Sequence, residues 1–110
     1  MKKIFVINKS AHDFSDALRF GELVYLSDGS YDPYSVAHMH RIFKEKMADS
    51  SPTDYILPTG LSIMQSVACA IFAAKHGRLN LLMFKDGRYI ERKLILEDTC
   101  TQEQSQKPQC

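Results

Sequence analysis

The densest group of side chains able to do chemistry directly follows the first apolar run of the chain. Lys9, Ser10, His12, Asp13 and Asp16 lie close together there. An imidazole beside a carboxylate is a pair that general-base catalysis uses and that also binds metal ions. His12 with Asp13 or Asp16 therefore defines one alternative, in which the protein is a small hydrolase or nuclease.

The same segment also has a structural interpretation. Asp13 and Ser15 would begin a helical turn, while Phe14, Leu18 and Phe20 would pack beneath it. For catalysis we favour this structural interpretation. For binding we do not, because a connection as long as residues 9–21 is unusual in a compact domain and is often functional.

A second group lies where an apolar run meets a helical pattern, at Pro58-Thr59-Gly60. A strand, a short turn and a helix leave backbone N–H groups and the positive helix end facing a crevice, which suits an anion. Thr59 as helix cap and Gly60 as turn residue is the structural alternative, and no phosphate-binding or dinucleotide glycine motif is present. The residues predicted to line a ligand crevice are Lys9, Ser10, His12, Thr59, Gly60 and Ser62.

Basic side chains concentrate in residues 75–93, where six lysines and arginines stand against two acidic residues. The six are Lys75, Arg78, Lys85, Arg88, Arg92 and Lys93. Such a patch beside Tyr89 could meet a phosphate backbone or an acidic protein face. A solvated hairpin explains the same charges, and we favour it over nucleic-acid binding.

The sequence predicts no metal site and no cofactor. His38 and His40 are two positions apart on a helical pattern, so they face different directions, whereas His38 and Arg41 share a face. No zinc-ligand spacing is present. Cys69 has apolar neighbours and is interpreted as an inert buried thiol, and His76 at the end of its helix is interpreted as a cation favoured by the helix dipole.

Composition predicts one globular domain. The chain has 110 residues, 45% hydrophobic and 25% charged, with a net charge of +1. That average combines −1 in residues 1–74, +4 in residues 75–93 and −2 in residues 97–110. We predict a folded domain over residues 1–96 and a mobile polar tail over residues 97–110. Three cysteines, two of them in the tail, predict a reducing cytoplasmic compartment, and no stretch predicts a signal peptide or a membrane span.

Hydrophobic patterning predicts an α/β domain of order β-β-α-β-α-β-β, a mixed sheet of about five strands with two helices. The Asp86-Gly87 dipeptide between two strand patterns predicts a C-terminal antiparallel hairpin. The expected strands are Lys3–Asn8, Glu22–Ser27, Tyr55–Leu57, 78–84 and 89–96. The first expected helix begins at Asp32-Pro33 and ends within residues 49–52, and the second spans Leu61–His76.

Two expectations concern how these elements are covered. The helix Leu61–His76 is apolar on nearly every face, which predicts a position in the middle of the domain. The last strand is predicted to lie at the sheet edge, where Arg92 and Lys93 either protect it or leave it to pair in a homodimer.

Three segments resemble small proteins of unassigned role encoded by tailed bacteriophages, and the similarity covers most of residues 3–95. They run from Asn8 to Ala17, from Arg19 to Ser27 and from Lys75 to Tyr89. The resemblance transfers no catalytic residue. It implies a setting in which small α/β proteins bind host proteins or sequester nucleotide signals.

Taken together, these observations predict a non-enzymatic binding module rather than an enzyme, acting in the host-cell cytoplasm. Its expected partner is a host protein or an anionic nucleotide-type ligand, held where the strands end. The alternatives left open are the hydrolase or nuclease using His12 and the nucleic-acid binder using residues 75–93.

Overall fold

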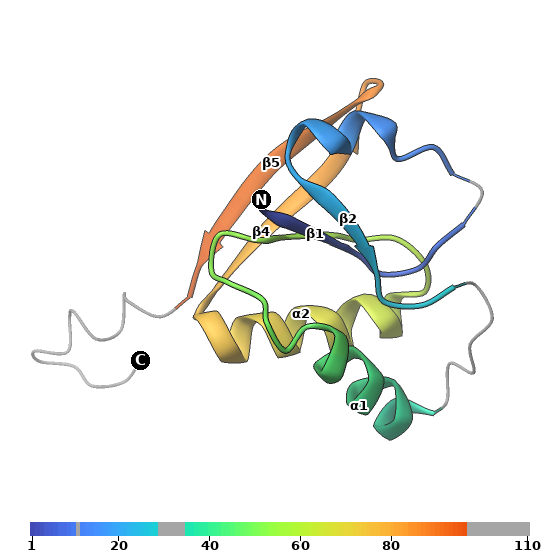
Figure 1. Ribbon diagram of the computed structural model, residues 1–110, viewed down its shortest axis with the longest axis vertical. Coiled ribbons are helices and arrows are strands. Elements are labelled where there is room, and N and C mark those ends of the chain that lie inside the picture. The colour runs from blue at the N-terminus through green and yellow to red at the C-terminus, as the bar shows by residue number, and fades with distance from the viewer. Residues whose placement is uncertain (11, 29–34, 97–110) are drawn as a thin grey trace, which may run out of the picture.

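The computed structural model describes residues 1–10, 12–28 and 35–96, which form one sheet with helices against it (Figure 1). In chain order the elements are β1 (Lys3–Val6), η1 (a 3-10 helix, Ser15–Arg19), β2 (Glu22–Tyr25), α1 (Val36–Lys46), β3 (Tyr55–Leu57), α2 (Ser62–His76), β4 (Arg78–Lys85) and β5 (Arg88–Ile95). This order of strands and α-helices is the predicted one. The helical turn expected to begin at Asp13 and Ser15 is present as η1, inside the connection between β1 and β2.

The five strands lie in the order β2-β1-β3-β4-β5, so β2 and β5 are the edges. β1 is parallel to β2 and β3, and β3 is parallel to β4. β5 is antiparallel to β4, because Asp86 and Gly87 turn the chain with φ of 51° and 82°, the positive values that a tight hairpin turn requires. The predicted α/β class, with a mixed sheet and a C-terminal antiparallel hairpin, is confirmed.

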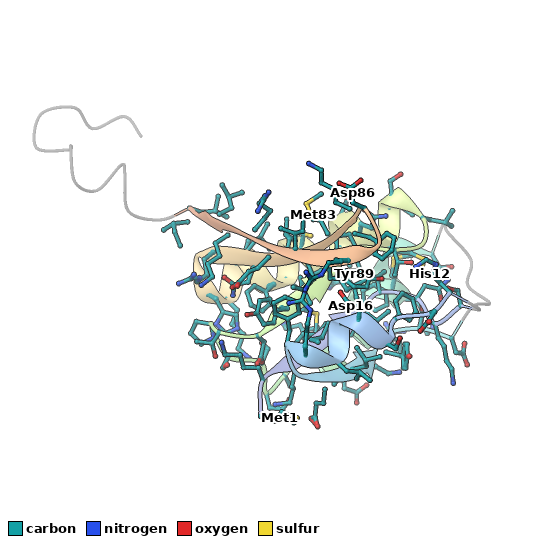
Figure 2. All side chains as sticks on the ribbon, turned by 90° about the horizontal axis from the view of Figure 1, so that it is seen from above. Met1, His12, Asp16, Met83, Asp86 and Tyr89 are labelled. Atoms are coloured by element: carbon teal, nitrogen blue, oxygen red, sulfur yellow. The ribbon has the colours of Figure 1, made fainter. Side chains whose placement is uncertain are left out.

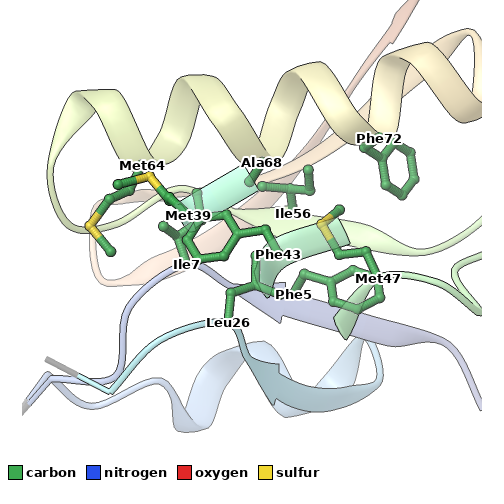
Figure 3. Close-up of a cluster of buried hydrophobic side chains, with 10 residues drawn as sticks. All are labelled: Phe5, Ile7, Leu26, Met39, Phe43, Met47, Ile56, Met64, Ala68 and Phe72. Atoms are coloured by element: carbon green, nitrogen blue, oxygen red, sulfur yellow. The ribbon is translucent and has the colours of Figure 1, made fainter. Parts of the chain in front are cut away.

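Both α-helices cover the same face of the sheet (Figure 1). Met39 and Phe43 of α1 and Met64, Ala68 and Phe72 of α2 recur every four residues and are almost completely buried, so each helix presents one apolar stripe to the sheet. Figure 3 shows the cluster that they build, which consists of Phe5, Ile7, Leu26, Met39, Phe43, Met47, Ile56, Met64, Ala68 and Phe72.

The opposite face of the sheet is covered by the connection that contains η1. Ile4 and Val6 of β1 pack on this side with Phe14, Ala17 and Tyr89 in a second buried cluster. β1 is therefore buried on both faces, which explains why its sequence is continuously apolar rather than alternating.

The predicted central position of α2 is wrong. Its buried residues form a single stripe, and Ile63 on another face is 37% exposed. Small alanines make the helix apolar all round without requiring burial on every side. Cys69 is half-buried rather than buried, and this burial raises the pKa of its thiol. Within the described ranges, no helix is long and apolar enough to cross a membrane.

One local expectation differs, and two others fall on residues that the structure does not describe. Leu18 was expected to pack beneath the helical turn, but it is 55% exposed, and Ala17 takes the buried position instead. α1 begins at Val36, and the helix start predicted at Asp32-Pro33 lies outside the described residues. The predicted tail, residues 97–110, also lies outside them.

A buried polar contact joins β3 to β4. The Asn80 side chain donates hydrogen bonds to the carbonyl oxygens of Pro52 (2.7 Å) and Asp54 (2.8 Å). The Asp54 carboxylate accepts the backbone N–H groups of Lys3 (3.0 Å) and Ser51 (2.8 Å). Asn80 and Asp54 are each 2% exposed, so this contact fixes the start of β1, the turn before β3 and the middle of β4 in one arrangement.

Candidate functional site

A pocket of about 450 Å³ opens where β3 and β4 end, beside the loop that follows β1. Its lining residues are Ser10, His12, Phe14, Leu57, Pro58, Thr59, Leu82, Met83, Phe84 and Tyr89. Small-molecule pockets typically measure about 300–1,000 Å³. The pocket thus has a suitable size and lies at the sheet edge where open α/β folds bind ligands.

Four rings form much of the pocket wall. The His12 ring centroid lies 5.1 Å from that of Phe14 and 5.9 Å from that of Phe84, and Phe84 lies 5.0 Å from Tyr89. Phe14 and Tyr89 belong to the second buried cluster, whereas Phe84 is 53% exposed at the mouth. The wall is therefore rigid at its base and offers exposed ring surface at its opening, an arrangement suited to a planar group.

η1 is fastened to the hairpin through the main chain of Tyr89. Asp16 Oδ2 accepts the Tyr89 N–H at 2.8 Å, and Arg19 Nη2 donates to the Tyr89 carbonyl at 2.6 Å. Arg19 Nε also lies 3.4 Å from Asp16 Oδ1. Figure 2 shows Asp16 beside Tyr89. We call these contacts the Asp16–Arg19 clamp; it holds one wall of the pocket in position.

The two carboxylates near His12 have structural partners. Asp13 Oδ1 accepts the Ser15 N–H at 2.9 Å, and this bond, more than the nearby His12, lowers the Asp13 pKa. The Tyr89 N–H likewise lowers the pKa of Asp16. A lowered pKa weakens a carboxylate as a proton acceptor. Across the described residues, no hydrogen bond joins His12 to either carboxylate, and both carboxylates are engaged by backbone N–H groups instead.

The pocket brings together three of the six predicted ligand-binding residues, which are Ser10, His12 and Thr59. Thr59 does not cap α2, because the helix begins at Ser62 with Leu61 at its N-cap position. Thr59 lines the pocket instead. Two hydroxyl groups and one imidazole thus stand at its rim.

The other three predicted residues do not line this pocket. The Lys9 ammonium lies over the Tyr25 ring, 5.5 Å from its centroid. Gly60 has φ of +85°, and a side chain there would come within 3.0 Å of Asn8, so this glycine serves a close backbone approach. Ser62 is exposed on the first turn of α2.

The basic residues of 75–93 do not form one surface. Lys75 donates to the carbonyl oxygens of Met47 and Ala48, where it satisfies the end of α1. The Arg78 guanidinium binds Asn80 Oδ1 at 3.1 Å, at the opposite end of the hairpin from its turn.

The remaining four cations are spread along the hairpin. Lys85 and Arg88 flank the turn, whereas Lys93 pairs with Glu91 at 3.2 Å. Neighbouring residues of a strand point to opposite faces, which separates Arg92 from Lys93. Five residue pairs, or about 17 Å, lie between the turn and Lys93. This dispersion does not favour the nucleic-acid alternative.

The histidines away from the pocket have local partners. Arg41 Nη2 lies 3.1 Å from His38 Nδ1, which confirms that these residues share a face. His76 Nε2 lies 2.9 Å from Ser50 Oγ, and burial, with Lys75, lowers the His76 pKa. The folded state thus favours neutral His76, contrary to the cation expected from the helix dipole. In the part of the chain that the structure describes, no group of three His, Cys, Asp or Glu side chains could hold a metal ion.

Seven of the ten pocket residues are not among the predicted ligand-binding residues, and three of these seven carry aromatic rings: Phe14, Phe84 and Tyr89. The sequence assigns Phe14 to packing beneath the helical turn, and Phe84 falls within the expected strand 78–84. Hairpin register could have found two of them: a two-residue turn at Asp86-Gly87 pairs Phe84 with Tyr89 on one face of the sheet. Which face of the sheet carries the Phe84–Tyr89 pair depends on tertiary packing.

The chain matches a protein-family model. The family model described as phage Pam3 gp32-like protein matches residues 2–95, which includes every described element and the whole pocket. No curated protein and no solved structure matches the chain.

Proposed function

The chain belongs to the phage Pam3 gp32-like protein family, and from that premise we propose that it is a small phage accessory module that binds a nucleotide-type ligand in the host cytoplasm. The observation that carries the proposal is the ring-walled pocket at the carboxyl edge of the sheet. Binding rather than catalysis is proposed because Asp13 and Asp16, the acidic partners of His12, are held by backbone N–H groups.

The base of the ligand would enter the pocket. Phe84 and His12 offer exposed ring surface for stacking, and the hydroxyl groups of Ser10 and Thr59 can hydrogen-bond the edge of a base. Base–aromatic stacking is worth about 1–3 kcal/mol for each base. No lysine or arginine is among the lining residues, so ring contacts rather than charge would supply most of the affinity.

The anionic part of the ligand would lie outside the pocket. Thr59 is followed within three residues by the first turn of α2, whose N-terminus has no side-chain cap and so keeps backbone N–H groups available. Burial raises the Tyr89 pKa most, and the negative charges of Asp13 and Asp16 raise it further. These two carboxylates therefore lie on the Tyr89 side of the pocket, away from Thr59. A phosphate is therefore expected toward Thr59 and away from η1.

A thermal-shift screen tests the proposal. Nucleosides, nucleoside mono- and diphosphates, cyclic nucleotides and inorganic phosphate are each added to the purified chain. At a hundredfold excess over Kd, a ligand stabilises by about 2.7 kcal/mol, or roughly 10–20 °C in Tm for a domain of this size. We expect nucleotides to raise Tm, nucleosides to raise it less, and phosphate alone to have no effect.

A matched pair of variants locates the site. Phe84→Ala should abolish the shift, whereas Leu18→Ala should retain it, since the two side chains are 53% and 55% exposed and only Phe84 lines the pocket. No shift with any nucleotide would overturn the proposal and leave a host protein as the partner of the exposed rings. Turnover of a nucleotide that His12→Ala abolishes would establish the hydrolase alternative instead.

A further inference from the structure

The main-chain groups of β5 that face away from β4 are hydrogen-bonded along only part of the strand. Leu96 N donates to Gly77 O at 2.9 Å, so the main chain of Leu96 faces β4. Alternate residues of a strand face the same way, so Leu94, Arg92 and Ile90 also bond to β4. The odd-numbered residues of β5 therefore direct their N–H and C=O groups outward.

The clamp confirms this alternation and limits the open edge. Tyr89, an odd-numbered residue, has its outward N–H and C=O groups occupied by Asp16 and Arg19. Glu91, Lys93 and Ile95 come next along the edge. Arg92 Nη1 reaches Glu91 O at 3.1 Å on the exposed side, and among the described residues nothing bonds the outward main-chain groups of Lys93 and Ile95.

The open part of the edge is also apolar. Leu94 is 50% exposed, and Ile95 and Leu96 are each 46% exposed. Soluble proteins normally protect such an edge with charges or cover it. Here the clamp covers the edge only as far as Tyr89. The Glu91 N–H and the outward main-chain groups of Lys93 and Ile95 are available to another strand, and the Glu91 carbonyl becomes available when the exposed Arg92 side chain releases it.

We propose that this open edge pairs with the same edge of a second copy, antiparallel, about a two-fold axis at Arg92. In this register Glu91 of each copy faces Lys93 of the other copy. Ile90 of each copy faces Leu94 of the other copy, on the helix-covered side of the sheet. The sequence is thus complementary to itself in both charge and hydrophobicity. Glu91 Oε2 already binds Lys93 at 3.2 Å and Tyr55 at 3.1 Å, which leaves Oε1 for the second lysine.

The geometry also sets the strength of the pair. Two hydrogen-bonded residue pairs give about four ladder bonds, and the clamp stops the ladder at Tyr89. Arg92 faces Arg92 of the second copy, which opposes pairing. So small an interface lies at the weak end of specific association, so the dimer is expected only at high protein concentration.

Sedimentation velocity under reducing conditions, from about 10 µM to about 1 mM, tests the proposal. Wild-type chain should shift from monomer toward dimer across this range. Lys93→Glu puts like charges opposite each other and should weaken the dimer at least tenfold. Lys93→Glu combined with Glu91→Lys exchanges the two charges, restores complementarity and should recover the dimer. Arg92→Ala removes the like-charge pair and should strengthen it several-fold.

Circular dichroism shows whether each variant is folded, so loss of association is not confused with loss of structure. A wild-type chain that stays monomeric at the highest concentration overturns the proposal. So does a dimer that Lys93→Glu leaves intact, or a folded double variant that stays monomeric, because either result assigns the contact to another register or surface.

Discussion

Replacing Asn80 with aspartate or leucine tests the buried contact that holds β3 beside β4. Both substitutions keep the approximate size of the side chain and remove its two N–H donors. In each case the carbonyl oxygens of Pro52 and Asp54, now bonded at 2.7 and 2.8 Å, lose their partner. The Asp54 carbonyl is fully buried in this contact, whereas the Pro52 carbonyl is partly buried.

The expected cost follows from those two groups. An unsatisfied buried acceptor costs about 1–3 kcal/mol, and the partly exposed one lies at the low end, so Asn80→Leu should cost about 2–4 kcal/mol. Asn80→Asp should cost at least as much at pH 7, because its carboxylate then faces two carbonyl oxygens. Such a loss is a large fraction of the roughly 5–15 kcal/mol that stabilises a domain.

The aspartate variant also predicts a pH dependence with a definite sign. We expect burial and the repulsion of the two carbonyl oxygens to outweigh the attraction of the Arg78 guanidinium, and so to raise the pKa of the introduced carboxyl group in the folded state above its unfolded value of about 3.9. The unfolded chain therefore loses its proton first as pH rises, so the variant loses stability from about pH 4 upward. Below pH 4 the protonated acid donates one hydrogen bond and part of the stability returns.

The free energy of unfolding of each variant is measured by urea unfolding at pH 3.5 and pH 7. Unfolding is followed by far-ultraviolet circular dichroism, because the chain has no tryptophan for fluorescence. Gln65→Glu is a matched control, because the Gln65 amide donates to the Gly60 carbonyl on the exposed surface, at 3.1 Å. It should cost less than about 1 kcal/mol. If both Asn80 variants cost no more than this control, or if Asn80→Asp is equally destabilised at pH 3.5 and pH 7, the reasoning is refuted.

Three further predictions follow from burial and backbone geometry. The folded state favours neutral His76, so the free energy of unfolding should rise with pH up to about pH 7, as the unfolded histidine, with a pKa near 6.5, releases its proton. His76→Gln should flatten this rise in urea midpoints measured at pH 5 and 7.5, and an unchanged rise would contradict the prediction. Gly21→Ala would press a methyl group against the Lys2 carbonyl oxygen, which bonds Glu22 N at 2.9 Å, so the pairing of β1 with β2 should weaken; a Tm equal to that of the wild type would count against this close approach. Phe72→Ala empties a fully buried position between α2 and the sheet and should cost about 3–5 kcal/mol in urea unfolding, and a loss below about 1 kcal/mol would mean that the core is not packed as described.

The elements were predictable where local chemistry decides them. Asp86 and Gly87 supply the positive φ values of a tight turn, and this fixes the hairpin without reference to the rest of the chain. The apolar run at Ile4–Ile7 likewise predicts a strand buried on both faces. The position of α2 was not predictable, because alanine is compatible with water and with a core alike, and only the arrangement of the sheet decides which faces are covered.

The candidate site was predictable at its rim but not at its wall. Ser10, His12 and Thr59 follow strand ends, a relation visible in the sequence. Phe84 and Tyr89 belong to the antiparallel hairpin, so no rule about parallel strand ends points to them. The contact of Asp16 with Tyr89 spans 73 residues and depends on both ends being folded, so spacing alone could not reveal it.

The Asp16–Arg19 clamp also bears on the order in which the molecule assembles and comes apart. The hairpin closes through residues that are neighbours in sequence, whereas the clamp joins residues 73 positions apart, so we expect the pocket wall to form after the hairpin during folding. The Tyr89 amide is held by the partly buried side chain of Asp16 instead of a neighbouring strand, and its proton should exchange with solvent whenever η1 detaches, without unfolding of the sheet. The exchange rate of this single amide would then report how often the pocket opens, and a bound ligand should slow it.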